Sequence, residues 1–138
     1  MRYIPAKLRR LVIRRAAGRC EYCGLSQAGQ EATFHIDHII PVTAGGLTAA
    51  ENLALACVSC SLRKSARQTA VDPQTGEEAA LFHPRQDVWS EHFQCRGVKL
   101  VGITATGRAT VKALSLNRAA ILAIRQEEVA RGRHPAIP

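Results

Sequence analysis

Two cysteine pairs with identical spacing lie in the first half of the chain. Cys20 and Cys23 form one Cys-x-x-C motif, and Cys57 and Cys60 form the other. Each motif can present two thiolates to one ion from a tight turn, and two such motifs complete a tetrahedral zinc site. Four thiolates fill the coordination shell of zinc, so this ion would support the fold rather than react with a substrate. The spacing therefore predicts a structural zinc centre.

The segment between the two motifs is 33 residues long, which is longer than in a zinc ribbon. It contains the sequence His-Ile-Asp-His at positions 35–38. The carboxylate of Asp37 is a hard oxygen ligand for a Mg²⁺-like ion, and the neighbouring imidazole of His38 titrates near neutral pH. Phosphodiester hydrolysis uses such a pair, because a metal neutralises the phosphate while a base activates water. Strand alternation would direct the two side chains to opposite faces, unless the strand end before Pro41 redirects them.

Composition restricts the class of protein. The chain has 138 residues and a formal net charge of +8, which predicts one domain and a polyanionic partner, most simply nucleic acid. Cys95 is left over if four cysteines bind zinc, and an odd thiol suits a reducing compartment. No apolar run approaches the roughly 20 residues that span a bilayer. We expect a soluble, cytoplasmic protein that does not bind membranes. The first 19 residues contain seven basic residues and no acidic one: Arg2, Lys7, Arg9, Arg10, Arg14, Arg15 and Arg19.

The elements that must position these residues follow from local patterns. Apolar residues at helical spacing predict a basic helix from Pro5 to about Gly18. Alternation predicts a strand over 33–40, and an apolar run predicts a return strand over 53–56. A helix capped by Ser59 or Ser61 should follow and end near position 67.

The second half of the chain predicts a further set of helices and strands. A turn is expected at 72–76, apolar segments at 79–82 and 89–93, and a strand at 98–103. Thr104 or Thr106 could cap a helix that ends near Leu114. Asn117 could cap a last helix that ends near Arg131, with Ile121, Leu122, Ile124 and Val129 on its apolar side and a frayed tail from Gly132. Trp89 and Phe93 are predicted to fill the core of this half.

Several of these motifs together resemble the HNH endonucleases of the His-Me finger, or ββα-metal, group. The resemblance rests on D-H-I-I-P, G-G, E-N-L, and the second C-x-x-C with a following lysine. Downstream, D-P-x-T-G, L-F-H-P-R, W-x-x-H-F and G-R-A-T are similar to an accessory region of bacterial members. The resemblance implies an α+β fold with a zinc-pinned ββα-metal core over 20–70. A basic N-terminal helix would precede it, and an α/β extension over 71–138 would follow within the same domain.

The resemblance also implies roles for individual residues. His38 matches the general base, and Asp37 matches a ligand of a catalytic divalent metal, Mg²⁺ or Mn²⁺. Asn52 matches the asparagine that braces the loop near the base, and the four cysteines match the zinc ligands. The third residue of the motif is normally His or Asn, but this chain has Ser61 there. Serine is a poorer ligand, and His35 could compensate for it.

Phosphate contacts are expected from basic residues beside this core, although each could equally belong to a solvated helix face. His83 and His92 are interpreted as structural histidines. The expected function is a metal-dependent endonuclease that acts on DNA, with RNA left open as a substrate. Two alternatives remain: a non-catalytic, zinc-stabilised nucleic-acid-binding module, and a structural zinc domain of a larger assembly. The candidate phosphate contacts are Arg10 and Arg14 on the first helix, and Arg63, Lys64 and Arg67 at the start of the helix after the second cysteine pair.

Overall fold

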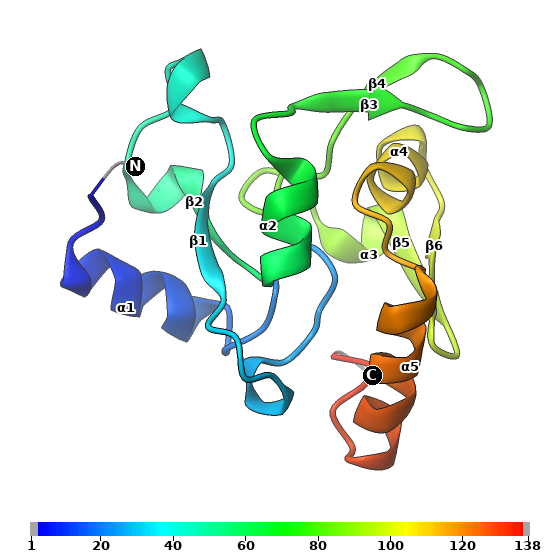
Figure 1. Cartoon of the computed structure of the whole chain (residues 1–138). Coiled ribbons are helices and arrows are strands. Elements are labelled where there is room, and N and C mark those ends of the chain that lie inside the picture. The colour runs from blue at the N-terminus through cyan, green and yellow to red at the C-terminus, as the bar shows by residue number, and fades with distance from the viewer. Residues whose placement is uncertain (1–2, 137–138) are drawn as a thin grey trace.

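The computed structural model describes residues 3–136, so Arg2 lies outside the described residues (Figure 1). Helices and small antiparallel two-stranded sheets alternate along the chain, which confirms the α+β prediction. Within the described range no helix has the length and apolar character needed to cross a bilayer. The α-helices are α1 (Ala6–Arg15), α2 (Val58–Lys64), α3 (Trp89–His92), α4 (Ala105–Ala113) and α5 (Ala119–Ala130). The strands are β1 (His35–His38), β2 (Leu53–Ala56), β3 (Thr69–Val71), β4 (Glu78–Ala80), β5 (Phe93–Arg96) and β6 (Lys99–Gly102), and short 3₁₀ turns cover Gln27–Gly29, Val42–Ala44 and Ala50–Asn52.

Strands β1 and β2 pair antiparallel, with His38 opposite Leu53, and α2 follows directly. This is the predicted ββα arrangement, and β2 has its predicted bounds. Strand β1 ends earlier than expected. The side chain of Asn52 binds the backbone N–H and C=O of Ile40, so a neighbouring strand cannot pair with those groups. Helix α1 begins at Ala6, one residue after the predicted start, and ends at Arg15, before the predicted end at Gly18. It lies against β2, and its Val12 is fully buried.

The start and end of α2 differ from the prediction. Cys57, rather than Ser59 or Ser61, occupies the N-cap position, and its Sγ accepts a hydrogen bond from the backbone N–H of Cys60 at 3.4 Å. The helix also ends at Lys64, before the predicted position near 67, because Ser65 has a positive φ of 50°. The Cys-x-x-C turn thus supplies the cap, since a thiolate can accept backbone N–H groups as a serine hydroxyl does.

Two hairpins and a helix form most of the second half. Strands β3 and β4 are joined through the predicted turn, and β5 pairs with β6. Helix α4 packs against β3, β4 and β6. Thr104 is its cap, as predicted, because its Oγ1 accepts from the N–H of Gly107 at 3.0 Å.

Helix α5 is not capped by Asn117, contrary to the prediction. The amide of Asn117 binds both the N–H and the C=O of Leu100, at 2.9 and 2.7 Å, so it ties α5 to β6 instead. The buried face of α5 is also different from the expected one, since it carries Arg125 and Glu128 beside Ile121. Val129, which was assigned to the apolar side, is 46% exposed.

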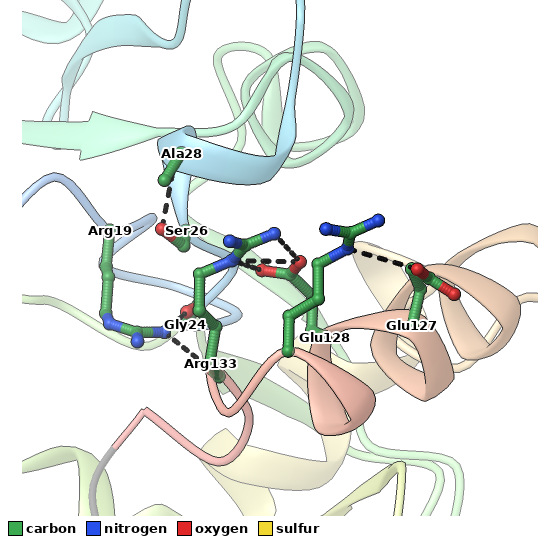
Figure 2. Close-up of polar contacts among 8 residues, drawn as sticks. Arg19, Gly24, Ser26, Ala28, Glu127, Glu128 and Arg133 are labelled. Carbon is green, nitrogen blue, oxygen red and sulfur yellow. Dashed lines mark hydrogen bonds and ion pairs between the residues drawn. The ribbon is translucent and has the colours of Figure 1, made fainter.

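The segment after α5 is held to the first cysteine pair. Figure 2 shows Arg133 between Glu128 and Arg19. The guanidinium of Arg133 forms an ion pair with Glu128 at 2.7 Å, and Arg19 donates to the carbonyls of Arg133 and Gly24, each at 2.9 Å. The prediction of a frayed tail is therefore wrong for Arg133.

An aromatic cluster joins the two halves of the chain. Phe82 packs edge-on against Tyr22 and Phe93, with ring centroids 6.5 and 5.3 Å apart. Trp89 stacks on Phe93 at 4.9 Å and donates its Nε1–H to the carbonyl of Tyr22 at 2.9 Å. Phe93 is buried and Trp89 partly buried, as the sequence predicts. His92 also has the expected structural contact, at 2.7 Å from Thr104 Oγ1. The same is true of His83, whose ring accepts backbone N–H groups.

Asp72 organises the β3–β4 turn, and its replacement by Asn is expected to lower the melting temperature at neutral pH. Its fully buried carboxylate accepts two hydrogen bonds from Arg108, at 3.0 and 2.9 Å, and others from Gln74 N–H and Thr75 Oγ1. The bond from Arg108 contributes most to lowering the pKa of Asp72. The stabilisation is therefore complete above the unfolded-state pKa of about 4 and is lost as pH falls toward the lower folded-state pKa.

Melting curves of wild type and Asp72→Asn across the acid range would test this effect. The gap between them should narrow below about pH 4, because the Asp72 carboxyl of the unfolded wild-type chain becomes protonated there while that of the folded chain is still ionised. Glu127→Gln is the control, since its surface pair with Arg131 contributes little to stability. A gap that stays constant down to the lowest pH would contradict the ionic role of Asp72.

Candidate functional site

The four cysteines of the two Cys-x-x-C motifs come together in the fold. All are buried, and their sulfur atoms lie within 4.8 Å of one another. The Sγ atoms of Cys23 and Cys57 are 3.8 Å apart. Four sulfur atoms bound to one tetrahedral zinc ion at Zn–S distances of about 2.3 Å lie about 3.8 Å from one another, which matches this separation. Within residues 3–136 this is the one group of three or more His, Cys, Asp or Glu side chains arranged to hold a metal ion.

Local structure explains how each motif reaches the cluster. The first follows α1, where an isolated bridge pairs Arg19 with Ser26 and a positive φ at Gly24 turns the chain back. The second forms the cap of α2. Burial raises the pKa of Cys20, whereas hydrogen bonds from the other cysteines lower the pKa of Cys57. A divalent cation bound at the cluster would favour the thiolate form of its cysteine ligands, because only the deprotonated sulfur binds the metal.

A buried cation on α5 accompanies this cluster, and sequence reasoning did not find it. The guanidinium of Arg125 is 2% exposed and donates to the carbonyl of Val98 at 2.9 Å. Burial lowers the pKa of Arg125, while the nearby Cys23, Cys60 and Cys95 raise it. Positions 121, 125 and 128 have the spacing of one helix face, which could have indicated that Arg125 is buried beside Ile121. Arginine is usually exposed, so the spacing was not interpreted in this way.

Asp37 and His38 line one surface groove, with a volume of about 1240 Å³, together with His35 and Ser61. All four residues of β1 line it, so the groove runs along this strand. Ser61 is the lining residue from α2, and none of the four cysteines lines the groove. The structure thus gathers the residues expected to perform chemistry at one solvent-accessible surface.

Asp37 is only 8% exposed and has two partners inside the protein. Its Oδ2 accepts from the hydroxyl of Tyr22 at 2.7 Å and forms an ion pair with Lys64 Nζ at 3.2 Å. Burial raises the pKa of Asp37, and the charge of Lys64 is the largest opposing influence. The carboxylate is thus oriented by two groups that the sequence did not connect to it.

Lys64 is not available to contact a phosphate, contrary to the expectation. It is 2% exposed, lies at the end of α2 rather than the start, and also donates to the carbonyl of His38 at 3.3 Å. The ammonium group of Lys64 therefore links Asp37, the candidate metal ligand, to the backbone carbonyl of His38, the proposed base. The local sequence predicts surface charge at this position, because nothing near Lys64 in the sequence indicates its buried partner Asp37.

Contacts from the following loop orient His38. Its Nε2 lies 2.9 Å from Thr48 Oγ1, and a hydrogen bond at one ring nitrogen selects the tautomer of the other. Asn52 shapes the same loop by donating to the carbonyls of Ile40 and Leu47, at 3.0 and 2.9 Å. Gly46 completes the turn, because a Cβ there would lie 1.7 Å from the carbonyl oxygen of Ile40. The position of Asn52 agrees with the bracing role that the resemblance implies.

The two tentative metal ligands meet across β1 and α2. His35 Nδ1 lies 3.0 Å from Ser61 Oγ. An imidazole and a hydroxyl therefore stand side by side on the groove that Asp37 also lines. Carboxylate and hydroxyl oxygens are of the kind that Mg²⁺ and Mn²⁺ prefer, so the donor types fit such an ion.

The other candidate phosphate contacts lie on the surface but outside this groove. Arg10 and Arg14 are exposed on α1, whereas their neighbour Arg9 lines the groove. Arg63 is exposed in the last turn of α2 and Arg67 is exposed after the helix ends, so neither lies at the predicted start of the helix, and both contact residues at or after the end of α4. Arg67 donates to the carbonyl of Ala113 at 3.0 Å, and Arg63 contacts Ser59 at 3.1 Å.

Comparison with known proteins identifies one family in this region. The model of the HNH endonuclease family matches residues 20–67, from the first cysteine to just beyond α2. The matched segment contains the four-cysteine cluster together with β1, β2 and α2. Searches of the curated proteins and of the solved structures give no significant match.

Proposed function

We propose that this chain, an HNH-family protein in its segment 20–67, is a metal-dependent endonuclease that hydrolyses phosphodiester bonds in DNA. The observation that carries the proposal is the shared groove, to which His38, Asp37 and Ser61 all contribute. The net charge of +8 suits a polyanionic substrate. The HNH family supports a nuclease-type or nucleic-acid-associated function, and DNA cleavage is the specific form proposed here.

We assign a structural zinc ion to the four cysteines. Four sulfur ligands leave no open coordination position for a water molecule, so this site would support the fold. Cys57 both contributes a ligand and caps α2, so ion binding would fix the helix that carries Ser61. The groove residues therefore depend on the zinc for their position, not for their chemistry.

His38 would take a proton from the water that attacks phosphorus, with its ring held by Thr48. Asp37, with Ser61 and His35, would hold a Mg²⁺ or Mn²⁺ ion. That ion, when bound, would neutralise charge on the phosphate and on the departing oxygen. Lys64 and Tyr22 would keep the Asp37 carboxylate in one orientation. Few protein groups would be needed, since Mg²⁺ usually retains several waters and binds substrate phosphates.

A plasmid-nicking assay on zinc-loaded protein tests the proposal. Cleavage is expected with added Mg²⁺ or Mn²⁺ and not in zinc-loaded protein without them. Labelled single-stranded and duplex DNA should be cleaved under the same conditions, and an RNA of the same sequence shows whether DNA is preferred. If the protein binds DNA but does not cleave it with any divalent ion tested, the proposal that it is an endonuclease is wrong.

That outcome would favour a second candidate function, a non-catalytic zinc-stabilised nucleic-acid-binding module. Two observations support it. The ammonium of Lys64 already neutralises Asp37, and the serine at position 61 is a weak metal ligand. Both candidates predict salt-sensitive binding to DNA, so cleavage is the measurement that separates them.

Ser61→Asn is expected to raise the cleavage rate several-fold and to lower the Mg²⁺ concentration needed for half-maximal rate. A carboxamide oxygen is a better ligand than a hydroxyl, and position 61 lies on the groove beside His35. The rate should be measured against metal concentration. Ser59→Asn on the same helix is the matched control, because Ser59 faces a different part of the surface. Equal metal dependence of Ser61→Asn and wild type would show that position 61 does not hold the ion.

A further inference from the structure

The proposed catalytic groove extends to two residues without an assigned role, Tyr3 and Arg9. Both line it together with His38 and Asp37. Tyr3 is 80% exposed, and Arg9 is exposed on α1. We propose that this end of the groove binds a single-stranded segment of DNA, with one base stacked on Tyr3 and one backbone phosphate against Arg9.

The exposure of Tyr3 is unusual for an aromatic residue in this chain. Tyr22, Phe34, Phe82 and Phe93 are buried, and Trp89 is partly buried. Tyr3 instead presents its ring to solvent at the edge of a groove that already contains catalytic candidates. An exposed ring beside a cationic groove is the arrangement with which proteins stack single-stranded bases.

Charge on the groove suits a phosphate backbone. Arg9, His35 and His38 line it, and Asp37 is the one acidic lining residue within 3–136. Lys64 neutralises that carboxylate from inside the protein. The groove therefore presents net positive charge to a ligand, with Arg9 as its exposed permanent cation.

Helix geometry explains why Arg9 is selected over the arginines that the sequence favoured. Successive residues on an α-helix are about 100° apart, so Arg9 and Arg10 face different directions. Arg10 and Arg14 are four residues apart and share another face, outside the groove. Arg9 is therefore chosen as the phosphate contact because of its position on the helix, and not because the surrounding sequence is rich in basic residues.

The single-stranded form follows from the requirement for an exposed base. In a duplex the faces of each base are covered by the neighbouring pairs, so a side chain can stack on one only after it is unstacked. A single strand offers these faces at little cost. This inference rests on the proposed site but not on its catalytic activity, because binding can be measured without cleavage.

The test is fluorescence anisotropy of labelled single-stranded and duplex DNA of one sequence, with zinc-loaded protein and no added Mg²⁺ or Mn²⁺. Tyr3→Leu is expected to weaken single-strand binding about 5- to 150-fold, the range for loss of one base–aromatic stack. Duplex binding should change less than about twofold by the same reasoning. Tyr3→Phe should bind like wild type, because the ring is retained. Circular dichroism of each variant confirms that the fold is unchanged, as expected for an exposed side chain.

Arg9→Gln tests the phosphate contact. Its plot of log affinity for the single strand against log salt should be shallower by about 0.7, the slope for one phosphate contact on a single strand. Arg10→Gln is the neighbouring comparison, and Arg131→Gln, at the C-cap of α5, is the control. Helices α1 and α5 lie on opposite sides of the molecule (Figure 1). In both of these variants the slope of log affinity against log salt should change less than in Arg9→Gln.

Two results would overturn the inference: wild-type single-strand affinity in Tyr3→Leu, or equal losses for single strand and duplex. These results differ from failure of the endonuclease proposal. If the protein never cleaves DNA yet Tyr3→Leu loses single-strand binding selectively, the binding site stands and the catalytic function falls. If it cleaves DNA and Tyr3→Leu has no selective effect, only the single-strand site is rejected.

Discussion

Replacement of His38 by alanine is expected to lower the rate of DNA cleavage by about 10²–10⁴-fold, the usual effect of losing a general base. Without the imidazole of His38, the proposed base that takes the proton from the attacking water is lost. Melting temperature and zinc content should stay near the wild-type values, because His38 is only partly buried and does not belong to the cysteine cluster. Initial rates of plasmid nicking at saturating Mg²⁺ would measure the loss.

A second histidine supplies the control for this experiment. His134 is half-buried, its Nε2 lies 3.0 Å from the carbonyl of Gly97, and it does not line the groove. His134→Ala should therefore nick DNA at the wild-type rate. If His38→Ala also nicks at the wild-type rate, His38 is not the base and the proposed mechanism is wrong.

Removal of the metal from the four-cysteine site is expected to unfold the HNH region. Binding of a structural zinc ion contributes about 10–16 kcal/mol in small zinc domains, comparable with the 5–15 kcal/mol that stabilises a typical fold. The cysteine cluster joins the end of α1 to the start of α2, and Cys57 also caps α2. Chelated protein, and the Cys57→Ser variant, should lose helical signal in circular dichroism and should lack bound zinc.

Cys95 distinguishes loss of a metal ligand from loss of any thiol. It is half-buried on β5 and is not a member of the cluster. Cys95→Ser should therefore keep one zinc per chain and melt close to the wild-type temperature. Equal melting of the metal-free and metal-loaded wild type would exclude a structural role for the ion.

Features decided by neighbours in sequence were predictable. The two Cys-x-x-C motifs identified the four cysteines that the fold positions to hold a metal ion, because a tight turn brings residues three apart to one point. The apolar run predicted a strand over 53–56, and β2 has these bounds. Thr104 caps α4 as predicted. The caps of α2 and α5 were predicted incorrectly, and for Ser61 and Asn117 the reason is the same. Ser61 and Asn117 have suitable side chains, but distant groups engage them: His35 in one case and Leu100 in the other.

The candidate site shows the same division between local and distant information. The sequence alone determined which groups are present, an imidazole at 38 and a carboxylate at 37, because these are matters of residue type. Only the tertiary structure decided that Tyr22 and Lys64 hold Asp37, that Arg9 rather than Arg10 lines the groove, and that α5 buries Arg125. Each of these depends on packing between elements far apart in the chain. Whether a charged side chain can be buried depends on the partner that lies beside it in the folded chain, and residue spacing does not reveal that partner.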